Sequence, residues 1–230
     1  MAKIVVFPCC AKKKPQYWLH KGQKVEFVAN PDKCAKLSGF LYCHPDDRNP
    51  HTGKTWRAEL DDYNKQYQHN GKNPRYLCEA YKLYEPKQHK KIYQQLYSNF
   101  KERLFILSAG WGLVRADFLL PYYDITFSSS APVCKRRKES DEYHDFNQLA
   151  DEKLEENDSI YFFGLKDYLS LYCCLTRDLL CKKVIYHRST RIRICQAEGY
   201  EYIQYRREGI AIEKWHYKCA EDFMEGKLQE

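Results

Sequence analysis

The chain lacks any long hydrophobic run. In its 230 residues, no apolar stretch approaches the roughly 18 residues of a membrane-spanning helix, and the mean hydropathy is −0.75. The apolar stretch at residues 4–7 is too short for a secretory signal. We therefore expect a cytoplasmic protein with no membrane partner.

Closely spaced cysteine pairs of the metal-binding kind are also missing. The 11 cysteines are odd in number and irregularly spaced, which favours free thiols in a reducing compartment over a disulfide framework. Cys34 and Cys43 stand too far apart for the usual structural zinc pattern, although they could join His44 and His51. We expect no metal and no cofactor, and a zinc site at these four residues is the open alternative.

Glycine and proline are scarce, with 10 and 9 residues, whereas hydrophobic residues make up 43% of the chain. That fraction is too high for a disordered protein and sufficient for a core. Tyrosine, with 20 residues, far exceeds phenylalanine, with 11. Because tyrosine has an apolar ring and a polar tip, these residues can fill a core, line a wet cleft or stack on bases.

Short β-branched or aromatic runs alternate with helical periodicity along the chain. The predicted strands are residues 3–7, 103–108, 159–164, 183–187 and 200–205. The predicted helices are residues 86–101, 144–156, 165–180 and part of 212–228. This alternation predicts one α/β domain over residues 1–230, with a mostly parallel central sheet flanked by helices.

Two irregular segments interrupt the alternation. Residues 30–85 are rich in Pro, Asn, Asp, His and Gly, and only residues 55–66 have a helical pattern there. We interpret residues 30–85 as an insertion at one edge of the sheet. Residues 121–143 form the second irregular segment.

Two loops follow predicted strands at the sheet edge where open α/β folds bind ligands. Residues 8–14 follow the first strand and carry Lys12 and Lys13, which can contact phosphate. Residues 108–114 follow the second strand and contain Ser108 and Gly110, where glycine lets the backbone approach a ligand. Ordinary connections with solvated lysines are the alternative.

The same loops carry a resemblance to a known family. A first strand with a Cys9- and Lys-bearing loop, then LSAGWGLV at residues 107–114 and LPYYD at 120–124, resembles the YaaA-type family and its bacterial and phage relatives. The extra tyrosine between Pro121 and Asp124 departs from the family's Pro-Tyr-Asp pattern. The resemblance covers the first strand and residues 104–124. It implies DNA binding and protection from DNA damage, and for the relatives an anti-phage role with base-glycosidic chemistry.

A polar helix face in the predicted insertion is a further candidate for nucleotide binding. With Thr55 as N-cap, Arg57, Asp61 and Asn64 fall at i, i+4 and i+7 on one face. Asparagine can read an adenine edge, and arginine can read guanine or phosphate. An Arg57–Asp61 surface pair beside a buried apolar stripe is the alternative.

Clustered cations indicate a surface for a polyanion more specifically than the net charge of +7 does. These are the run Lys135, Arg136, Arg137 and Lys138, and the group Arg188, Arg191 and Arg193. Together they are predicted to contact DNA phosphates. Scattered solubilising charge is the alternative.

The leading functional hypothesis is a DNA glycosylase that hydrolyses the N-glycosidic bond of a modified base in base excision, repair or anti-phage defence. The partner is duplex DNA with the base flipped out and held by aromatic residues. A carboxylate would stabilise the oxocarbenium-like transition state, with Asp124 as first choice and Asp61 as second. Residues expected to bind the base or nucleotide are Ser108, Gly110, Trp111, Tyr122, Tyr123, Arg57 and Asn64.

Two alternatives stay open. One is a non-enzymatic, YaaA-like DNA-binding stress protein that releases no base. The other is a transglycosylase acting on free nucleotides or RNA, which would not need the basic patches.

Overall fold

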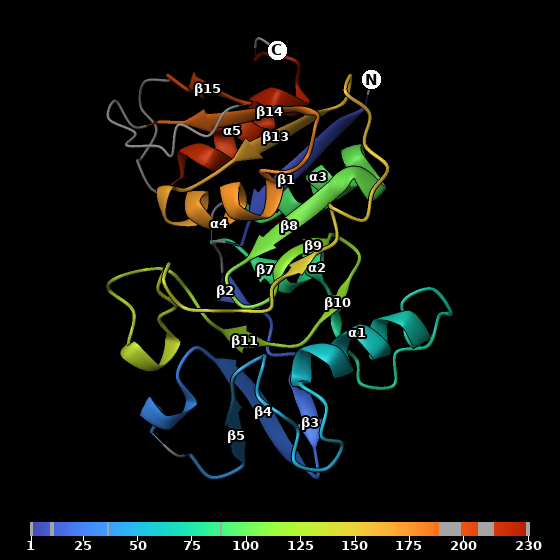
Figure 1. Ribbon diagram of the computed structural model, residues 1–230, viewed down its shortest axis with the longest axis vertical. Helices are drawn as coiled ribbons and strands as arrows, with labels where there is room; N and C mark the ends of the chain where they lie inside the picture. The colour runs from blue at the N-terminus through green and yellow to red at the C-terminus, as the bar shows by residue number, and fades with distance from the viewer. Residues whose placement is uncertain are drawn as a thin grey trace.

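The computed structural model describes residues 2–9, 12–35, 37–87, 89–188, 199–206 and 214–228, apart from the side chain of Lys12. Within these ranges, no helix is long and apolar enough to cross a membrane. A large sheet and a small sheet lie toward opposite ends of the long axis of the molecule (Figure 1).

Seven strands form the large sheet, in the order β12-β9-β8-β1-β13-β14-β15. Neighbouring strands are parallel except for the antiparallel pair β8–β9. The strands are β1 (Lys3–Pro8), β8 (Leu104–Ser108), β9 (Gly112–Arg115), β12 (Phe146–Asn147), β13 (Ser159–Phe163), β14 (Lys182–His187) and β15 (Tyr200–Gln204). This arrangement confirms the predicted α/β class and its mostly parallel central sheet.

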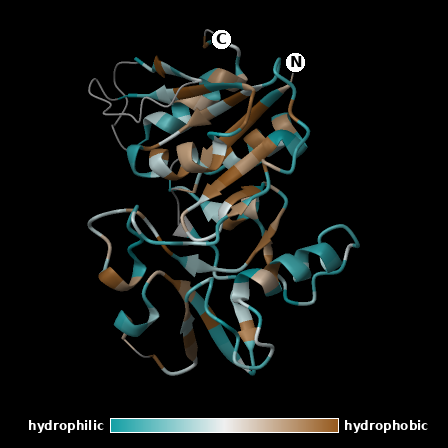
Figure 2. Cartoon of the chain, in the orientation of Figure 1, coloured by the Kyte–Doolittle hydropathy of each residue, from teal (hydrophilic) through white to brown (hydrophobic). Residues whose placement is uncertain are grey.

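The central strands of the large sheet are buried on both faces. Every residue of β8 and β13 is buried, as is β1 from Ile4 onward. Strands covered on both sides read as continuous apolar runs rather than as alternating ones. This is why the sequence pattern identified them, and Figure 2 shows them in the brown of hydrophobic residues.

Five α-helices are present in the described ranges: α1 (Trp56–Tyr67), α2 (Ala80–Leu83), α3 (Ile92–Phe100), α4 (Lys166–Thr176) and α5 (Trp215–Met224). Helix α1 begins at an N-cap where the Thr55 hydroxyl accepts a hydrogen bond from the Ala58 amide, as its sequence predicts. Helix α3 packs against α5, β1 and β8, and α5 also packs against β13. That helices flank the whole sheet stays a prediction.

The small sheet consists of β4 (Gln23–Val28) paired with β3 (Trp18–His20), β5 (Phe40–Cys43) and β11 (Tyr123–Asp124). Two short pairs, β2 (Lys12–Lys13) with β7 (Tyr84–Glu85) and β6 (Cys78–Glu79) with β10 (Leu119–Leu120), lie elsewhere. Short 3-10 turns are η1 (Pro31–Lys33), η2 (Lys101–Arg103) and η3 (Val133–Lys135). The small sheet thus joins β3 and β4, which precede residue 30, to β11 in the second irregular segment.

The helix predicted at residues 144–156 is wrong. Phe146 and Asn147 form β12, where they pair with Gly112 and Leu113 at the edge of the large sheet. The amides of Phe146 and Gln148 donate to the carbonyls of Trp111 and Leu113. Leu149, one of the apolar residues whose spacing suggests a helix, is buried although it lies in a turn.

Candidate functional site

The ends of three parallel strands define the place where a ligand is expected. The parallel strands β8, β1, β13, β14 and β15 lie in the order second, first, third, fourth and fifth along the chain. From β1 the chain adds its next strand on one side, at β8, and all later strands of these five on the other side, beginning at β13. The order of the strands therefore reverses beside β1, and open α/β folds bind ligands at such a switch point. Cys9 follows β1 there, Ser108 ends β8, and Tyr168 of α4 follows β13.

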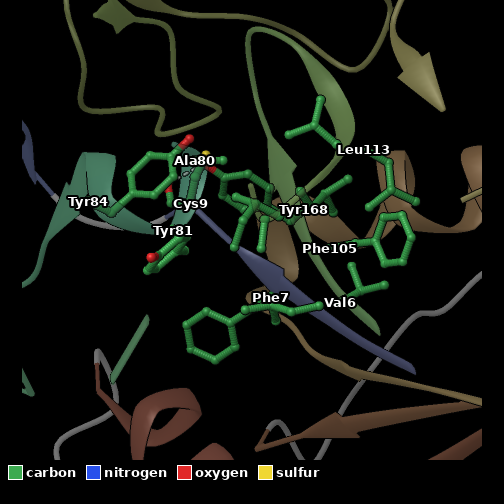
Figure 3. Close-up of a cluster of buried hydrophobic side chains, with 14 of the residues drawn as sticks. Val6, Phe7, Cys9, Ala80, Tyr81, Tyr84, Phe105, Leu113 and Tyr168 are labelled. Carbon is green, nitrogen blue, oxygen red and sulfur yellow. Dashed lines mark hydrogen bonds between the residues drawn. The ribbon is translucent and has the colours of Figure 1, made fainter. Parts of the chain in front are cut away.

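A buried network of hydroxyls and one thiol fills this point, and Figure 3 shows its members Cys9, Tyr84 and Tyr168 within the surrounding hydrophobic cluster. The hydroxyl of Ser108 donates to that of Tyr123 at 2.8 Å, and Tyr123 donates to the Cys9 sulfur at 3.1 Å. The hydroxyl of Tyr84 lies 2.7 Å from that of Tyr123. Tyr168 donates to the Cys9 carbonyl at 3.0 Å.

Burial sets the chemistry of this network. It raises the pKa of Tyr84 and of Tyr123 well above the ordinary value, so both phenols are neutral. Cys9 is only 4% exposed, and its sulfur is enclosed by Tyr123 and Tyr168. In this conformation, therefore, the network positions the strand ends and offers no accessible nucleophile.

The turn at residues 108–112 closes on itself. The Ser108 oxygen accepts the amides of Gly110 and Trp111 at 3.2 and 3.1 Å. A Cβ at Gly110 would lie 2.9 Å from the ring of Tyr123. Ser108, Gly110 and Tyr123, each predicted to bind a base, are therefore brought together, with their polar groups engaged in contacts of the protein itself.

Arg57 is directed into the protein and holds this turn from α1. Its guanidinium donates to the carbonyls of Gly110 and Trp111, each at 3.1 Å, and pairs with Asp46 at 2.5 Å. Burial alone would raise the pKa of Asp46, but the hydrogen bond and charge of Arg57 outweigh it and hold that pKa below its ordinary value. The two hydrogen bonds to carbonyls tie the start of α1 to the turn after β8, and the ion pair holds the guanidinium.

Arg137 holds the same turn from the second irregular segment. Its guanidinium donates to the Ala109 carbonyl at 2.8 Å and pairs with Asp145 at 2.5 Å. Its charge lies 3.7 Å from the ring centre of Tyr143. Arg137 is 6% exposed, so only part of the predicted cationic run reaches the surface.

Asn64 and Trp111, the other proposed base contacts, are also buried. The Asn64 amide nitrogen donates to the Leu119 carbonyl at 3.0 Å, and its oxygen accepts the Leu119 amide at 2.7 Å. Asn64 is 2% exposed and Trp111 is 0% exposed. In this conformation both support the fold.

Asp124 lies on the small sheet, next to Tyr123. Its carboxylate is 2.5 Å from the Lys135 amino group and is partly exposed. In the parallel pair β11–β4, Asp124 is opposite Val28 and Tyr123 is opposite Phe27. Since side chains alternate along a strand, Glu26 shares the outer face of this sheet with Tyr122 and Asp124.

Glu26 was not predicted, and it completes a pair of carboxyl groups. Burial, followed by the charge of Asp124, raises the pKa of Glu26 above its ordinary value, although Lys135 opposes this shift. The ring of Tyr122 lies 4.7 Å from that of Tyr17, centre to centre. Burial and then the charges of Asp124 and Glu26 raise the pKa of Tyr122. The two carboxyls, one lysine and two tyrosines therefore form one cluster.

The remaining predicted residues lie in separate places. Asp61, the second-choice carboxylate, lies on α1 in an ion pair with Lys65 at 2.6 Å. Arg136 donates to the Ala131 carbonyl, Lys138 is exposed, and Arg188 follows β14 with partial exposure. Lys13 lies 4.3 Å from the ring centre of Tyr123. Arg191, Arg193 and the side chain of Lys12 lie outside the described residues.

The four candidate zinc ligands have other neighbours. Cys34 hydrogen-bonds Cys134, and burial, followed by that bond, raises the pKa of Cys34 to about 12. His44 packs on Tyr143, and His51 stacks on His20. Cys43 is buried. Within the described ranges, no group of three or more potential ligands is placed to hold a metal ion.

Comparison of the chain with family models, with curated proteins and with solved structures found no match. The geometry is therefore interpreted from its own residues.

Proposed function

We propose that the protein is a DNA glycosylase that hydrolyses the N-glycosidic bond of a modified base and leaves an abasic site. The observation that carries the proposal is the Glu26–Asp124 pair on one sheet face, with Lys135 and tyrosine rings beside it. The resemblance of residues 104–124 to the YaaA-type family supports the same chemistry. Cytoplasmic location, a flipped base in duplex DNA and a role in repair or anti-phage defence belong to this proposal.

Asp124 is assigned to the sugar. Cleavage of the bond between C1′ and the base nitrogen leaves positive charge on the sugar, which a carboxylate stabilises. Asp124 is partly exposed and lies next to Tyr123, which the buried network holds in place. An anchored carboxylate of this kind needs little reorganisation when charge develops.

Glu26 is assigned to the leaving base. As the bond breaks, its electron pair passes to the base nitrogen, and the Glu26 carboxyl supplies the proton. Water then adds to C1′ and returns a proton to Glu26, so atoms and charge balance. The raised pKa of Glu26 supports this role, because a carboxyl must be protonated to act as an acid.

Lys135 is assigned to orienting Asp124. The hydrogen bond that Lys135 donates to the Asp124 carboxylate raises the pKa of Lys135 above its ordinary value and keeps the amine protonated. A protonated amine cannot attack C1′ to form an imine. The expected product is therefore an intact abasic site, which breaks only on treatment with alkali.

Base release from modified DNA tests the proposal. Wild-type protein is incubated with plain DNA and with DNA carrying modified bases, and alkali-labile sites are counted. Asp124→Asn should lower the rate at least about 100-fold, in the range for loss of a catalytic charge. Asp61→Asn is the matched control and should retain the rate. An unchanged rate in Asp124→Asn would reject that residue's role.

One observation favours a non-enzymatic DNA-binding protein as the second candidate. Asp124 is already paired with Lys135, and that pair would have to adjust around a sugar. Such a protein would bind DNA and release no base from any substrate tested. The same assay therefore separates the two candidates, and base exchange with added free bases would identify a transglycosylase.

A further inference from the structure

The small sheet has two contrasting faces. On the inner face, Trp18, Val25 and Phe27 are buried, and Trp18 and Phe27 pack against Trp56 of α1. The parallel pair β4–β5 places Phe40 opposite Lys24 and Tyr42 opposite Glu26. These four alternate with the inner residues and so belong to the outer face, together with Tyr122 and Asp124.

Aromatic rings follow one another across the outer face. From Tyr122, which neighbours Asp124, the centre of the next ring, Tyr17, is 4.7 Å away, and Phe40 lies 5.6 Å beyond Tyr17. Phe40 and Tyr42 are nearly parallel, with centres 6.2 Å apart. We name these four residues, Tyr17, Phe40, Tyr42 and Tyr122, the aromatic face. All four are partly exposed.

Charged groups on the same face restrict what can cover it. The amino group of Lys24 lies 5.3 and 5.7 Å from the ring centres of Tyr17 and Phe40. Glu26 and Asp124 stand beside the rings, and Asp124 is paired with Lys135. A lipid or an apolar protein surface would bury the charges of Lys24 and Glu26 and offer them no polar partner, which is costly.

A single-stranded nucleic acid meets each of these features. Its bases present π-faces to rings, its exocyclic amino groups can donate to carboxylates, and its phosphates suit lysine. The net charge of +7 favours such a partner over a neutral or cationic one. In a duplex the base faces are covered by neighbouring base pairs, so a ring surface of this kind favours unpaired nucleotides.

We infer that the aromatic face binds single-stranded DNA by base stacking and leads the strand to Asp124. The inference rests on the proposed glycosylase chemistry and replaces its duplex substrate with an unpaired or locally opened strand, whose flanking bases stack on Tyr17, Phe40 and Tyr42. Lys24 contacts a phosphate next to the stacked bases.

Fluorescence anisotropy with a labelled, mixed-sequence 12-nucleotide DNA tests the inference. Wild-type protein should bind the single strand more tightly than the matched duplex. Phe40→Leu and Tyr42→Leu should each weaken single-strand binding about 5- to 150-fold, because stacking on one ring contributes about 1–3 kcal/mol per base. Tyr42→Phe keeps the ring and should bind like the wild type.

Tyr76 supplies the matched control, because it is the aromatic residue with 78% exposure that lies outside the aromatic face, at a φ of 53°. Tyr76→Asn, which tolerates that backbone conformation, should leave binding unchanged. Quenching of 2-aminopurine in the same strand by wild-type protein is a readout that needs no variant.

Any of four results would overturn the inference. The protein could prefer the duplex, bind single-stranded RNA but not DNA, or fail to quench 2-aminopurine, or the leucine variants could fold and bind normally. If the Phe40 and Tyr42 variants release base at the wild-type rate, the proposed function is retained and the inference about the aromatic face is rejected. Ring-dependent binding of single-stranded DNA with no base release keeps the inference and removes the glycosylase.

Discussion

At the scale of single residues, several polar side chains predicted to bind a nucleotide instead bind the backbone of the protein itself. The sequence places Arg57 and Asn64 on one helix face, and the structure directs both inward, to carbonyls near Trp111 and to the backbone of Leu119. A sequence pattern reveals which residues share a helix face, but not whether that face meets solvent or a loop distant in the chain.

Gly112 lies where both the backbone conformation and a neighbouring carbonyl oppose a side chain. Its φ is +85°, and a Cβ there would lie 2.4 Å from the Phe146 carbonyl oxygen. Gly112→Ala should therefore lower the free energy of unfolding by about 2–4 kcal/mol, through strained backbone and overlap at the β9–β12 pair. Thermal unfolding measures this. Gly53→Ala, at φ +71° in open space, is the control and should cost only about 1–2 kcal/mol. Equal losses would contradict the role of the Phe146 contact.

His216 is predicted to make stability sensitive to acid. It is 1% exposed, neither ring nitrogen has a hydrogen-bond partner among the described residues, and burial, followed by the charge of His89, lowers its pKa to about 3. Between about pH 6.5 and 3 the unfolded chain binds a proton at this position that the folded chain does not. Stability from His216 is therefore complete above pH 6.5 and falls by up to about 1.4 kcal/mol per pH unit as the pH drops.

Urea unfolding at pH 7, 5.5 and 4.5 tests this dependence. His216→Phe should reduce the acid-side slope by up to one proton, whereas His69→Gln, at an exposed position, should leave the slope unchanged. If His216→Phe retains the full slope, other groups cause the acid sensitivity.

At the scale of elements, Asn64 joins α1 to β10. Asn64→Ala removes both hydrogen bonds to Leu119 and leaves buried backbone groups without partners, so it should lower the free energy of unfolding by about 2–4 kcal/mol. Chemical denaturation measures the change. Asn99 is exposed and donates only to the Gln95 carbonyl of its own helix and, in a weak bond of 3.5 Å, to the Met224 sulfur, so Asn99→Ala should stay within about 0.5 kcal/mol. A small loss for Asn64→Ala would mean that water replaces these bonds.

Several long elements were predictable from the sequence, whereas the six-residue strand β4 and the two-residue strands were not. β8 and β13 are fully buried runs, and α1 has its N-cap at Thr55, so local pattern identifies them. By contrast β11 has only two residues, and its pairing with β4 brings together Tyr123 and Phe27, which are 96 positions apart in the chain. Glu26 was missed for this reason, although the alternation of Lys24, Glu26 and the buried Val25 and Phe27 was a visible strand signal.

At the scale of the whole molecule, the cations behind the net charge of +7 differ in their exposure to solvent. Arg57 and Arg137 are buried in ion pairs, whereas Lys138 is exposed. Of these three residues, only Lys138 can contact a DNA phosphate and displace its counterion without breaking an ion pair of the folded protein.

Charge reversal at Lys138 tests this division. Lys138→Glu should weaken DNA binding and reduce the slope of log affinity against log salt by about 1, with an unchanged melting temperature. Lys72→Glu is an exposed control outside the predicted run. Arg137→Met should instead lower stability by about 3–5 kcal/mol, because Asp145 would remain buried without its partner. An unchanged salt slope in Lys138→Glu would remove that lysine from the DNA surface.

The hydroxyl of Tyr123 has a consequence for how the two sheets move. Tyr123 belongs to β11 of the small sheet, yet its hydroxyl is bound at the ends of β1 and β8 of the large one. A displacement of Asp124, its neighbour, must therefore either break this junction or carry it along. Opening the junction would expose the Cys9 thiol to alkylating reagents, so the labelling rate of that one sulfur measures the free energy that separates the closed and open arrangements.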